Sequence, residues 1–235
     1  MAFYLILVIM SKLIIANWKS NHNLQTAQAW VNQVLPAVAE AKVELVVAPP
    51  FSLLAPATGL LANSNFSLAV QDLSPFKAGS YTGAVCATNL VGLKIKYAIL
   101  GHSERRRHFH ETDEEVAAKV KQALVAGINP VICVDEPYLA SQHQALVQAG
   151  VDFAQSNLTV AYEPLAAIGT GQSADLGQVS QVISKIKELF GPVAVVYGGS
   201  VTAANISDYM AISDGVLVGS ASLQGESFVE LVKQV

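Results

Sequence analysis

Short apolar segments recur along this chain, and longer stretches with amphipathic helical spacing lie between them. The segments have the length and composition of buried strands. Strands that alternate with helices throughout a chain predict a parallel sheet, and eight such strands close into a (β/α)8 barrel. The expected strands are Leu13–Asn17, Glu44–Ala48, Ser67–Gln71, Tyr97–Gly101, Pro130–Val134, Leu158–Glu163, Val193–Tyr197 and Gly215–Val218. The clearest helical stretches are Thr26–Ala39, Asp113–Ala126, Glu136–Ala154 and Leu176–Phe190.

The apolar content of the chain fits this architecture. Hydrophobic residues make up 52% of the 235 residues, and the strands of a parallel barrel are buried on both faces. No Pro/Gly/Ser-rich linker or block of charge divides the sequence, so we expect a single barrel domain over residues 11–235. An open doubly wound sheet is the structural alternative. It is disfavoured because Asn17-Trp18-Lys19, rather than a glycine-rich fingerprint, follows the first expected strand.

The first ten residues, MAFYLILVIM, form an apolar run before the expected barrel. This run is too short to span a bilayer, and it lacks the basic region that begins a secretory signal. We interpret residues 1–10 as an N-terminal extension, consistent with a start codon assigned upstream of Met10. We therefore expect no membrane partner.

Charge and cysteine content narrow the classes of partner. The net charge of −4 argues against nucleic acid as a partner, and an anionic ligand would need a local positive site. The two cysteines, Cys86 and Cys133, form no disulfide framework and suit a reducing compartment, so we expect a cytoplasmic protein. Each is interpreted first as a small buried hydrophobic residue.

Polar residues stand at the carboxyl ends of several expected strands, where barrels of this class carry their chemistry. They are Asn17, Lys19, His102, Ser103, Glu104 and Glu163. Because the carboxyl ends of all the strands face one mouth of the barrel, we expect these side chains to meet there. A single lysine or histidine would more simply be a surface charge or a satisfied polar group, and it is the joint placement that indicates a site.

Residue type suggests a role for three of these side chains. Glu163 precedes Pro164, which holds it in extended geometry, and a carboxylate shielded from water can take a proton from carbon. His102 lies where a helical pattern begins, and a helix N-terminus favours a neutral imidazole that donates a hydrogen bond. Lys19 can offset the charge of a phosphate or of a developing enediolate.

Two glycine turns suggest an anion site. Gly198-Gly199-Ser200 precedes a helical stretch that begins near Ala203, and Gly219-Ser220 precedes the last expected helix. Glycine exposes backbone N–H groups at a helix start, and the turns after strands seven and eight commonly bind phosphate in this fold. One such turn would be weak evidence, and two at these strand ends are stronger.

Five segments resemble the triosephosphate isomerase family in order and spacing across almost the whole chain. They are Asn17–Asn21 (NWKSN), Gly101–Arg106 (GHSERR), Ala161–Gly171 (AYEPLAAIGTG), Tyr197–Val201 (YGGSV) and Gly215–Leu223 (GVLVGSASL). The resemblance implies interconversion of dihydroxyacetone phosphate and D-glyceraldehyde 3-phosphate through an enediolate, without metal or organic cofactor.

The resemblance also implies residue roles. Asn17 and Lys19 would bind the substrate, His102 would act as the electrophile and Glu163 as the base. Ser103 would hold the glutamate in the open site, with Glu104 in support, and residues 164–174 would form a closing lid. The implied phosphate ligands are Gly169, Ser200, Gly219 and Ser220.

The resemblance further implies a homodimer, built through the loop Gln71–Val85. A loop of this length without regular structure is uncommon unless it has a function. The alternative is a mobile surface loop.

Four positions depart from the family's pattern. Ala166 stands in place of a tryptophan at the lid hinge, Ser220 and Asp135 each replace a glycine, and Ala84 replaces a glutamate at the dimer contact. These departures keep open a barrel that binds a phosphate ligand or serves a structural role with its chemistry impaired. Another phosphosugar enzyme on the same fold is a second alternative, which the GHSERR and AYEP motifs disfavour.

Overall fold

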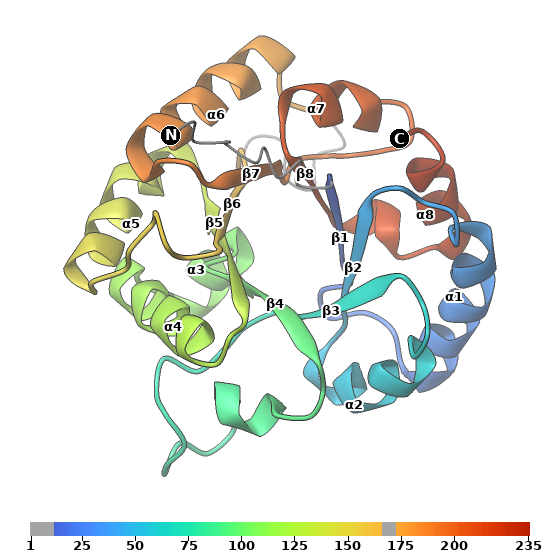
Figure 1. The fold of residues 1–235 in the computed structure, drawn as a ribbon, viewed down its shortest axis with the longest axis horizontal. Helices are drawn as coiled ribbons and strands as arrows, with labels where there is room; N and C mark the ends of the chain where they lie inside the picture. Colours follow the sequence, from blue (N-terminus) through green and yellow to red (C-terminus); the bar gives the residue numbers. More distant parts are fainter. Residues whose placement is uncertain (1–11, 166–172) are drawn as a thin grey trace, which may run out of the picture.

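The computed structural model describes residues 12–165 and 173–235, and in these residues the chain forms a closed barrel of eight parallel strands. Figure 1 shows the strands as an inner ring with the helices around it. Neighbouring strands pair in sequence order, and β8 pairs with β1 to close the ring. The strands are β1 Leu13–Asn17, β2 Glu44–Ala48, β3 Phe66–Val70, β4 Ile95–Leu100, β5 Asn129–Val134, β6 Thr159–Tyr162, β7 Ala194–Tyr197 and β8 Gly215–Val218. The predicted (β/α)8 barrel is confirmed.

Helices cover the outside of this ring. The α-helices of the described residues are α1 Leu24–Ala37, α2 Phe51–Leu60, α3 Ser103–Phe109, α4 Asp113–Val125, α5 Glu136–Gln148, α6 Leu176–Phe190, α7 Ile206–Ile212 and α8 Gly225–Val232. Two short 3-10 helices are η1 Ala87–Leu90 and η2 Ser220–Ser222. Several begin at a side-chain cap; Thr112, for example, accepts the backbone N–H of Glu115 at the start of α4.

The strands carry two apolar layers because alternate side chains point to opposite faces. Inside the barrel, residues such as Ile15, Val46, Ile99 and Val131 form a small buried cluster. Outside it, the other strand residues pack against the helices in a larger core. This double burial explains the high apolar content of the sequence.

Several of the observed helices and strands begin or end a few residues away from the expected bounds. The expected helix Glu136–Ala154 was too long, because α5 ends at Gln148 and Gly150 adopts a φ of +75°. The helical stretch expected near Ala203 begins later, at Ile206. In the intervening turn the Asn205 side chain accepts the Thr202 N–H at 2.8 Å and donates to the Ser200 carbonyl at 3.0 Å.

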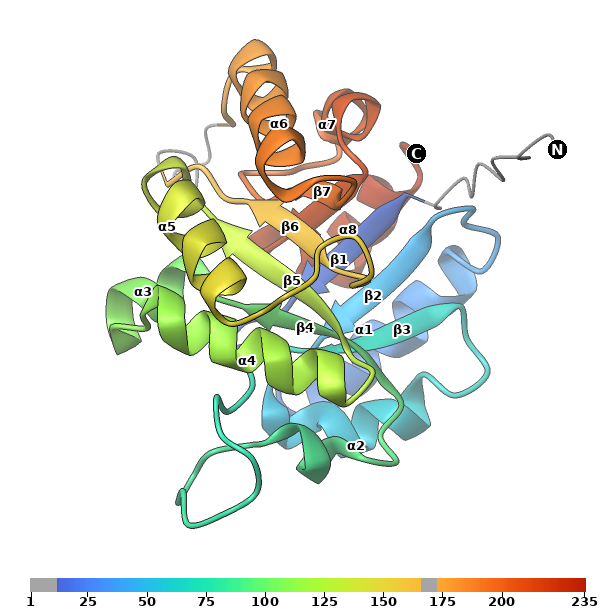
Figure 2. The same cartoon turned by 60° about the vertical axis from the view of Figure 1, so that its left-hand side comes forward.

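A long segment, Gln71–Val85, projects from the body of the barrel between β3 and η1 (Figure 2). Its base is tied down by Asp72, which pairs with Arg105 at 2.8 Å and with Lys119 at 2.7 Å. Near its tip, the Phe76 and Tyr81 rings stack with centroids 4.3 Å apart, and both remain about half exposed. The segment is therefore held at its base and offers two aromatic rings at its end.

Candidate functional site

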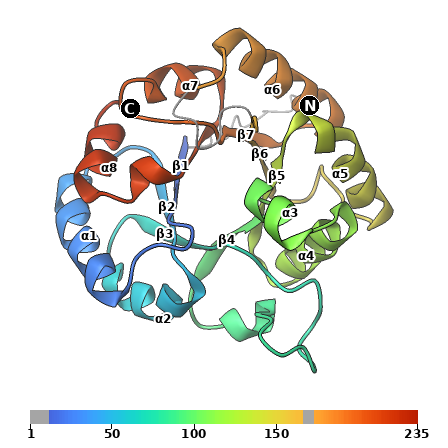
Figure 3. The ribbon, with the colours of Figure 1, turned by 180° about the vertical axis from the view of Figure 1, so that it is seen from behind.

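A cavity of about 330 Å³ lies at the carboxyl ends of the strands. Figure 3 shows the barrel from this end, with α3, which follows β4, in front. The cavity collects residues from five strand ends, and its lining includes Asn17, Lys19, His102, Glu163, Gly198, Gly199, Ser200, Gly219 and Ser220. Of the six polar residues expected at one mouth, Asn17, Lys19, His102 and Glu163 line this hollow. Ser103 and Glu104 do not line it, but they bond to Glu163 and Lys19, respectively.

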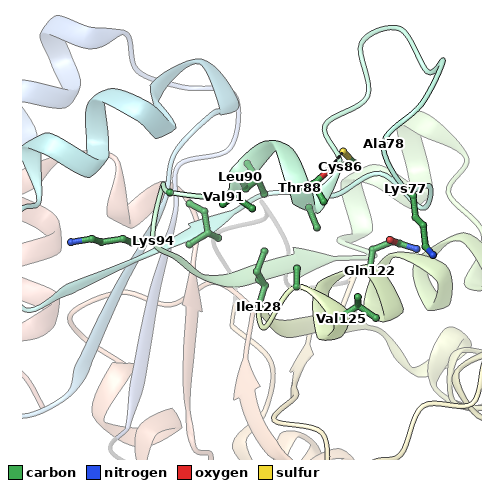
Figure 4. A pocket seen from close by; sticks show the side chains of 14 residues that line it. Lys77, Ala78, Cys86, Thr88, Leu90, Val91, Lys94, Gln122, Val125 and Ile128 are labelled. Atoms are coloured by element: carbon green, nitrogen blue, oxygen red, sulfur yellow. Dashed lines mark hydrogen bonds between the residues drawn. The ribbon is translucent and has the colours of Figure 1, made fainter.

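A larger cavity of about 540 Å³ lies elsewhere, under η1 and beside the end of α4. Figure 4 shows Val91, Val125 and Ile128 in its wall, with Lys77 and Lys94 at its two ends. No carboxylate or histidine is among the described residues that line it. The smaller cavity holds both a carboxylate and a histidine, so it is the better candidate for acid–base chemistry.

Glu163 and His102 face each other in the candidate site. Glu163 Oε1 lies 3.0 Å from His102 Nε2, and Glu163 Oε2 accepts the backbone N–H of Ser103 at 3.0 Å. Burial raises the pKa of Glu163, but His102 and Ser103 lower it by more, so its pKa falls below the ordinary 4.5. The carboxylate is therefore ionised and positioned at neutral pH.

The His102 ring is oriented by the helix that follows it. As the N-cap of α3, it accepts the Glu104 backbone N–H at Nδ1, at 3.2 Å. Burial lowers the pKa of His102, and the facing Glu163 carboxylate raises it by more, so that the pKa lies above 6.5. Above that pKa the ring is neutral, and the bond from Glu104 leaves its single proton on Nε2, facing the cavity.

Arg106 holds α3 against the barrel. Its guanidinium is buried and donates to the Gly101 carbonyl at 2.9 Å, to Asp113 at 2.6 Å and to Gln142 at 2.6 Å. These bonds reach from the end of β4 to α4 and α5. The helix that begins beside His102 is therefore fixed by a satisfied buried charge.

Lys19 supplies the positive charge of the cavity. Its Nζ pairs with Glu104 Oε1 at 2.7 Å, and its backbone adopts a φ of 51°, which is uncommon for a side chain of this size. Two side chains hold this backbone: Asn17 Oδ1 accepts the Lys19 N–H at 3.0 Å, and Gln71 Nε2 donates to the Lys19 carbonyl at 2.9 Å. The ammonium group is thus kept at the mouth by contacts from three strand ends.

The two glycine turns lie against the reactive side chains. A Cβ on Gly198 would stand 2.9 Å from Glu163 Cγ, and one on Gly199 would overlap the Tyr197 hydroxyl. A Cβ on Gly219 would lie 3.3 Å from Lys19 Cε. The backbone of these turns therefore approaches closer than a side chain would permit, as an anion site built from N–H groups requires.

Comparison with known proteins identifies the family of this chain. The family model described as "Triosephosphate isomerase" matches residues 12–235. The chain is 39% identical to a triosephosphate isomerase of Paracidovorax citrulli, an alignment that covers 94% of this chain and 97% of that protein. It is 37% identical to those of Thermoanaerobacter sp. (strain X514) and Thermus thermophilus, over 94% of this chain and 98% and 97% of theirs. The chain belongs to the triosephosphate isomerase family.

Some of the residues that the sequence analysis singles out lie outside the described residues. Gly169, an expected phosphate ligand, and Ala166, at the expected lid hinge, are both among them, as is the extension at residues 1–10. Within residues 12–165 and 173–235, no group of three His, Cys, Asp or Glu side chains is arranged to hold a metal ion. No helix in that part of the chain is long and apolar enough to cross a membrane.

The family motifs did not identify Gln71 as part of the site. Its side chain donates to two carbonyls, that of Lys19 at 2.9 Å and that of Ala48 at 2.7 Å. The sequence offers one signal for it, since Gln71 is a polar residue at the carboxyl end of an expected strand. Its contact with Lys19 depends on the barrel and could not be inferred from local pattern.

Proposed function

We propose that this chain interconverts dihydroxyacetone phosphate and D-glyceraldehyde 3-phosphate, with Glu163 as the carbon-acid base and His102 as the electrophile. The observation that carries the proposal is the 3.0 Å approach of Glu163 Oε1 to His102 Nε2 in a cavity that also holds Lys19. A substrate carbonyl oxygen near Nε2 would place the neighbouring carbon within reach of the carboxylate.

The reaction then needs only proton transfers. Glu163 takes a proton from the carbon beside the carbonyl, the C–H electron pair becomes a C=C bond, and the carbonyl oxygen becomes an oxyanion. The His102 Nε2–H and the Lys19 ammonium stabilise that oxyanion as it forms. Return of the proton from Glu163 to the former carbonyl carbon, with a proton passed between the two oxygens through His102, gives the isomer.

Binding of the phosphate falls to the turns after β7 and β8. Ser200, Gly219 and Ser220 line the cavity beside Lys19, and their backbone N–H groups are the expected donors to a phosphate oxygen. Asn17, whose side chain fixes the Lys19 backbone, completes the substrate contacts. In this proposal Ser103 and Glu104 position Glu163, His102 and Lys19 rather than touch the substrate.

The test compares the wild type with Glu163→Gln in a coupled assay on glyceraldehyde 3-phosphate. We expect kcat to fall roughly 10²- to 10⁴-fold, because an amide cannot take the proton. Glu188→Gln is the matched control, since Glu188 is exposed on α6, away from the cavity. An inactive wild type would leave only a phosphate-binding or structural role, and substantial activity in Glu163→Gln would overturn the assignment of the base.

We also propose that the chain acts as a homodimer through Gln71–Val85. Support comes from the tip of this segment, where stacked Phe76 and Tyr81 are about half exposed and would be covered by a second copy. Sedimentation should show a dimer at micromolar concentration, and Tyr81→Ser should shift it toward monomer. A monomeric wild type at that concentration would overturn this proposal. The Ala84 departure predicts a dimer that already weakens at nanomolar concentration.

The cytoplasm is the proposed location. Cys86 and Cys133 are both free and buried, which suits a reducing compartment. Cell fractionation would test this.

A further inference from the structure

Two buried tyrosines stack on each other next to the β7 turn, which is Gly198-Gly199-Ser200. Tyr197 is the last residue of β7, and Tyr209 lies in α7. Their ring centroids are 3.9 Å apart, and the ring planes differ by 13°. Rings that are nearly parallel at this distance are in van der Waals contact face to face. Tyr209 therefore forms one wall of the space that the Tyr197 ring occupies.

Both tyrosine hydroxyls bond to the same residue, Ala174, which lies just before α6. The Tyr209 hydroxyl donates to the Ala174 carbonyl at 2.6 Å, and the Tyr197 hydroxyl accepts the Ala174 N–H at 3.1 Å. The next residue, Asp175, is the N-cap of α6, and its side chain accepts the Gln178 N–H at 3.0 Å. The hydroxyl end of the stacked pair is thus held by backbone that is itself fixed at the start of a helix.

The Tyr197 hydroxyl also supports the β7 turn. A Cβ built on Gly199 would overlap this hydroxyl, so the hydroxyl occupies the place that a side chain at 199 would take. The Gly199 backbone therefore packs directly on the Tyr197 hydroxyl. Gly199 and Ser200 both line the cavity that holds Lys19. A shift of the Tyr197 ring would consequently move the backbone that faces the cavity.

The helix that carries Tyr209 holds the other end of the β7 turn. Asn205, which immediately precedes α7, donates from its side chain to the Ser200 carbonyl at 3.0 Å. The Tyr209 N–H donates to the Asn205 carbonyl at 3.4 Å, one helical turn away. Tyr209 is therefore linked to the β7 turn from both sides, through the Tyr197 ring before the turn and through Asn205 after it.

We propose that Tyr209 is a positioning residue for phosphate binding, because it holds the Tyr197 ring and, through that ring, the Gly199 backbone. This inference rests on the phosphate contacts proposed above for the turns after β7 and β8. Backbone N–H groups bind an anion well only when they converge on it, so a small displacement of the turn weakens binding. Neither tyrosine is among the described residues that line the cavity of Lys19, so Tyr209 acts on a ligand through the turn.

The experiment measures the Kd of inorganic phosphate by titration calorimetry in the full chain. It compares the wild type with Tyr209→Phe, which keeps the stack and removes the hydroxyl, and with Tyr209→Leu, which removes both. We expect Kd to rise about threefold in Tyr209→Phe and about tenfold in Tyr209→Leu. In the coupled assay on glyceraldehyde 3-phosphate, KM should rise with Kd while kcat stays within about twofold, because Glu163 and His102 are untouched.

Tyr97→Phe is the matched control. Tyr97 is also buried, but it pairs with Asn129 at the start of β5, toward the end of the barrel away from the mouth. This variant should leave the Kd of phosphate unchanged. Hydrogen exchange at the Ala174 amide adds a readout that needs no ligand. It should become faster in Tyr209→Phe, since the Ala174 carbonyl loses its donor, and stay unchanged in Tyr97→Phe.

Several results would overturn the inference. They are an unchanged Kd in Tyr209→Leu, or in Tyr209→Phe should the leucine variant not fold, an equal rise of Kd in Tyr97→Phe, and a fall in kcat at unchanged KM. With an active wild type, each of these would leave the proposed isomerase function intact. A wild type that binds no phosphate would also overturn the inference. An inactive wild type that binds phosphate would refute the isomerase function alone, because the titration needs no turnover.

Discussion

Gly198, the first residue after β7, leaves no room for a side chain beside the proposed base. A Cβ built there would stand 2.9 Å from Glu163 Cγ and 3.3 Å from the Tyr162 carbonyl oxygen. Unstrained carbon contacts begin near 3.5 Å, so the Glu163 side chain in Gly198→Ala must retreat by at least about 0.6 Å. That displacement would move Glu163 Oε1 away from its position 3.0 Å from His102 Nε2.

A misplacement of about 1 Å at a reacting group can cost on the order of 10²-fold in rate. We therefore expect kcat for glyceraldehyde 3-phosphate to fall between about 10- and 100-fold in Gly198→Ala, with KM little changed because the turn keeps its N–H groups. The assay is the coupled turnover measurement at saturating substrate. Gly59→Ala is the matched control: in α2, a Cβ on Gly59 would meet nothing within 4 Å, and helix propensity favours alanine by about 1 kcal/mol. A folded Gly198→Ala protein with kcat within twofold of the wild type would refute the steric argument.

Two further predictions concern stability. Folding raises the pKa of His102 above 6.5, so the contribution of His102 to stability is complete below about pH 6.5 and is lost as the pH rises through the folded pKa. Folding lowers the pKa of Glu163 below 4.5, so the contribution of Glu163 is lost as the pH falls through its folded pKa. In urea unfolding, the advantage of the wild type over His102→Gln should therefore be largest between about pH 4.5 and 6.5, and an advantage that grows toward pH 9 would contradict this. Arg106→Met should cost about 3–5 kcal/mol of unfolding free energy, because Asp113 and Gln142 lose a buried charged donor; a loss below about 1 kcal/mol would contradict it.

The barrel could be predicted from the sequence because its strands are apolar on both faces. Segments such as Leu13–Asn17 and Gly215–Val218 match the observed strands, and others shift by one or two residues at their ends. The helix expected over Glu136–Ala154 is longer than α5 because the amphipathic pattern continues past Gly150 and into the turn around Asp152. The spacing of apolar residues identifies the buried face of a helix, but it does not fix the residue at which the helix ends.

The sequence could predict which residues meet in the site, but it could not predict their hydrogen bonds. That His102 and Glu163 would share one mouth follows from barrel topology alone. The proton on Nε2 follows instead from a single N–H at the start of α3, and the contact of Gln71 with the Lys19 carbonyl follows from where the ends of β1 and β3 lie. Neither leaves a trace in residue type or spacing, because each depends on how one strand end meets the next.

The left-handed backbone of Lys19 places function and stability in conflict at one position. A side chain in this conformation costs about 1–2 kcal/mol relative to glycine, which adopts it freely. A chain that evolved only toward a more stable fold would therefore lose its lysine here, and with it the cation at the mouth. If the proposed function holds, the strain at Lys19 is stability that the protein gives up to keep a cation beside its substrate phosphate.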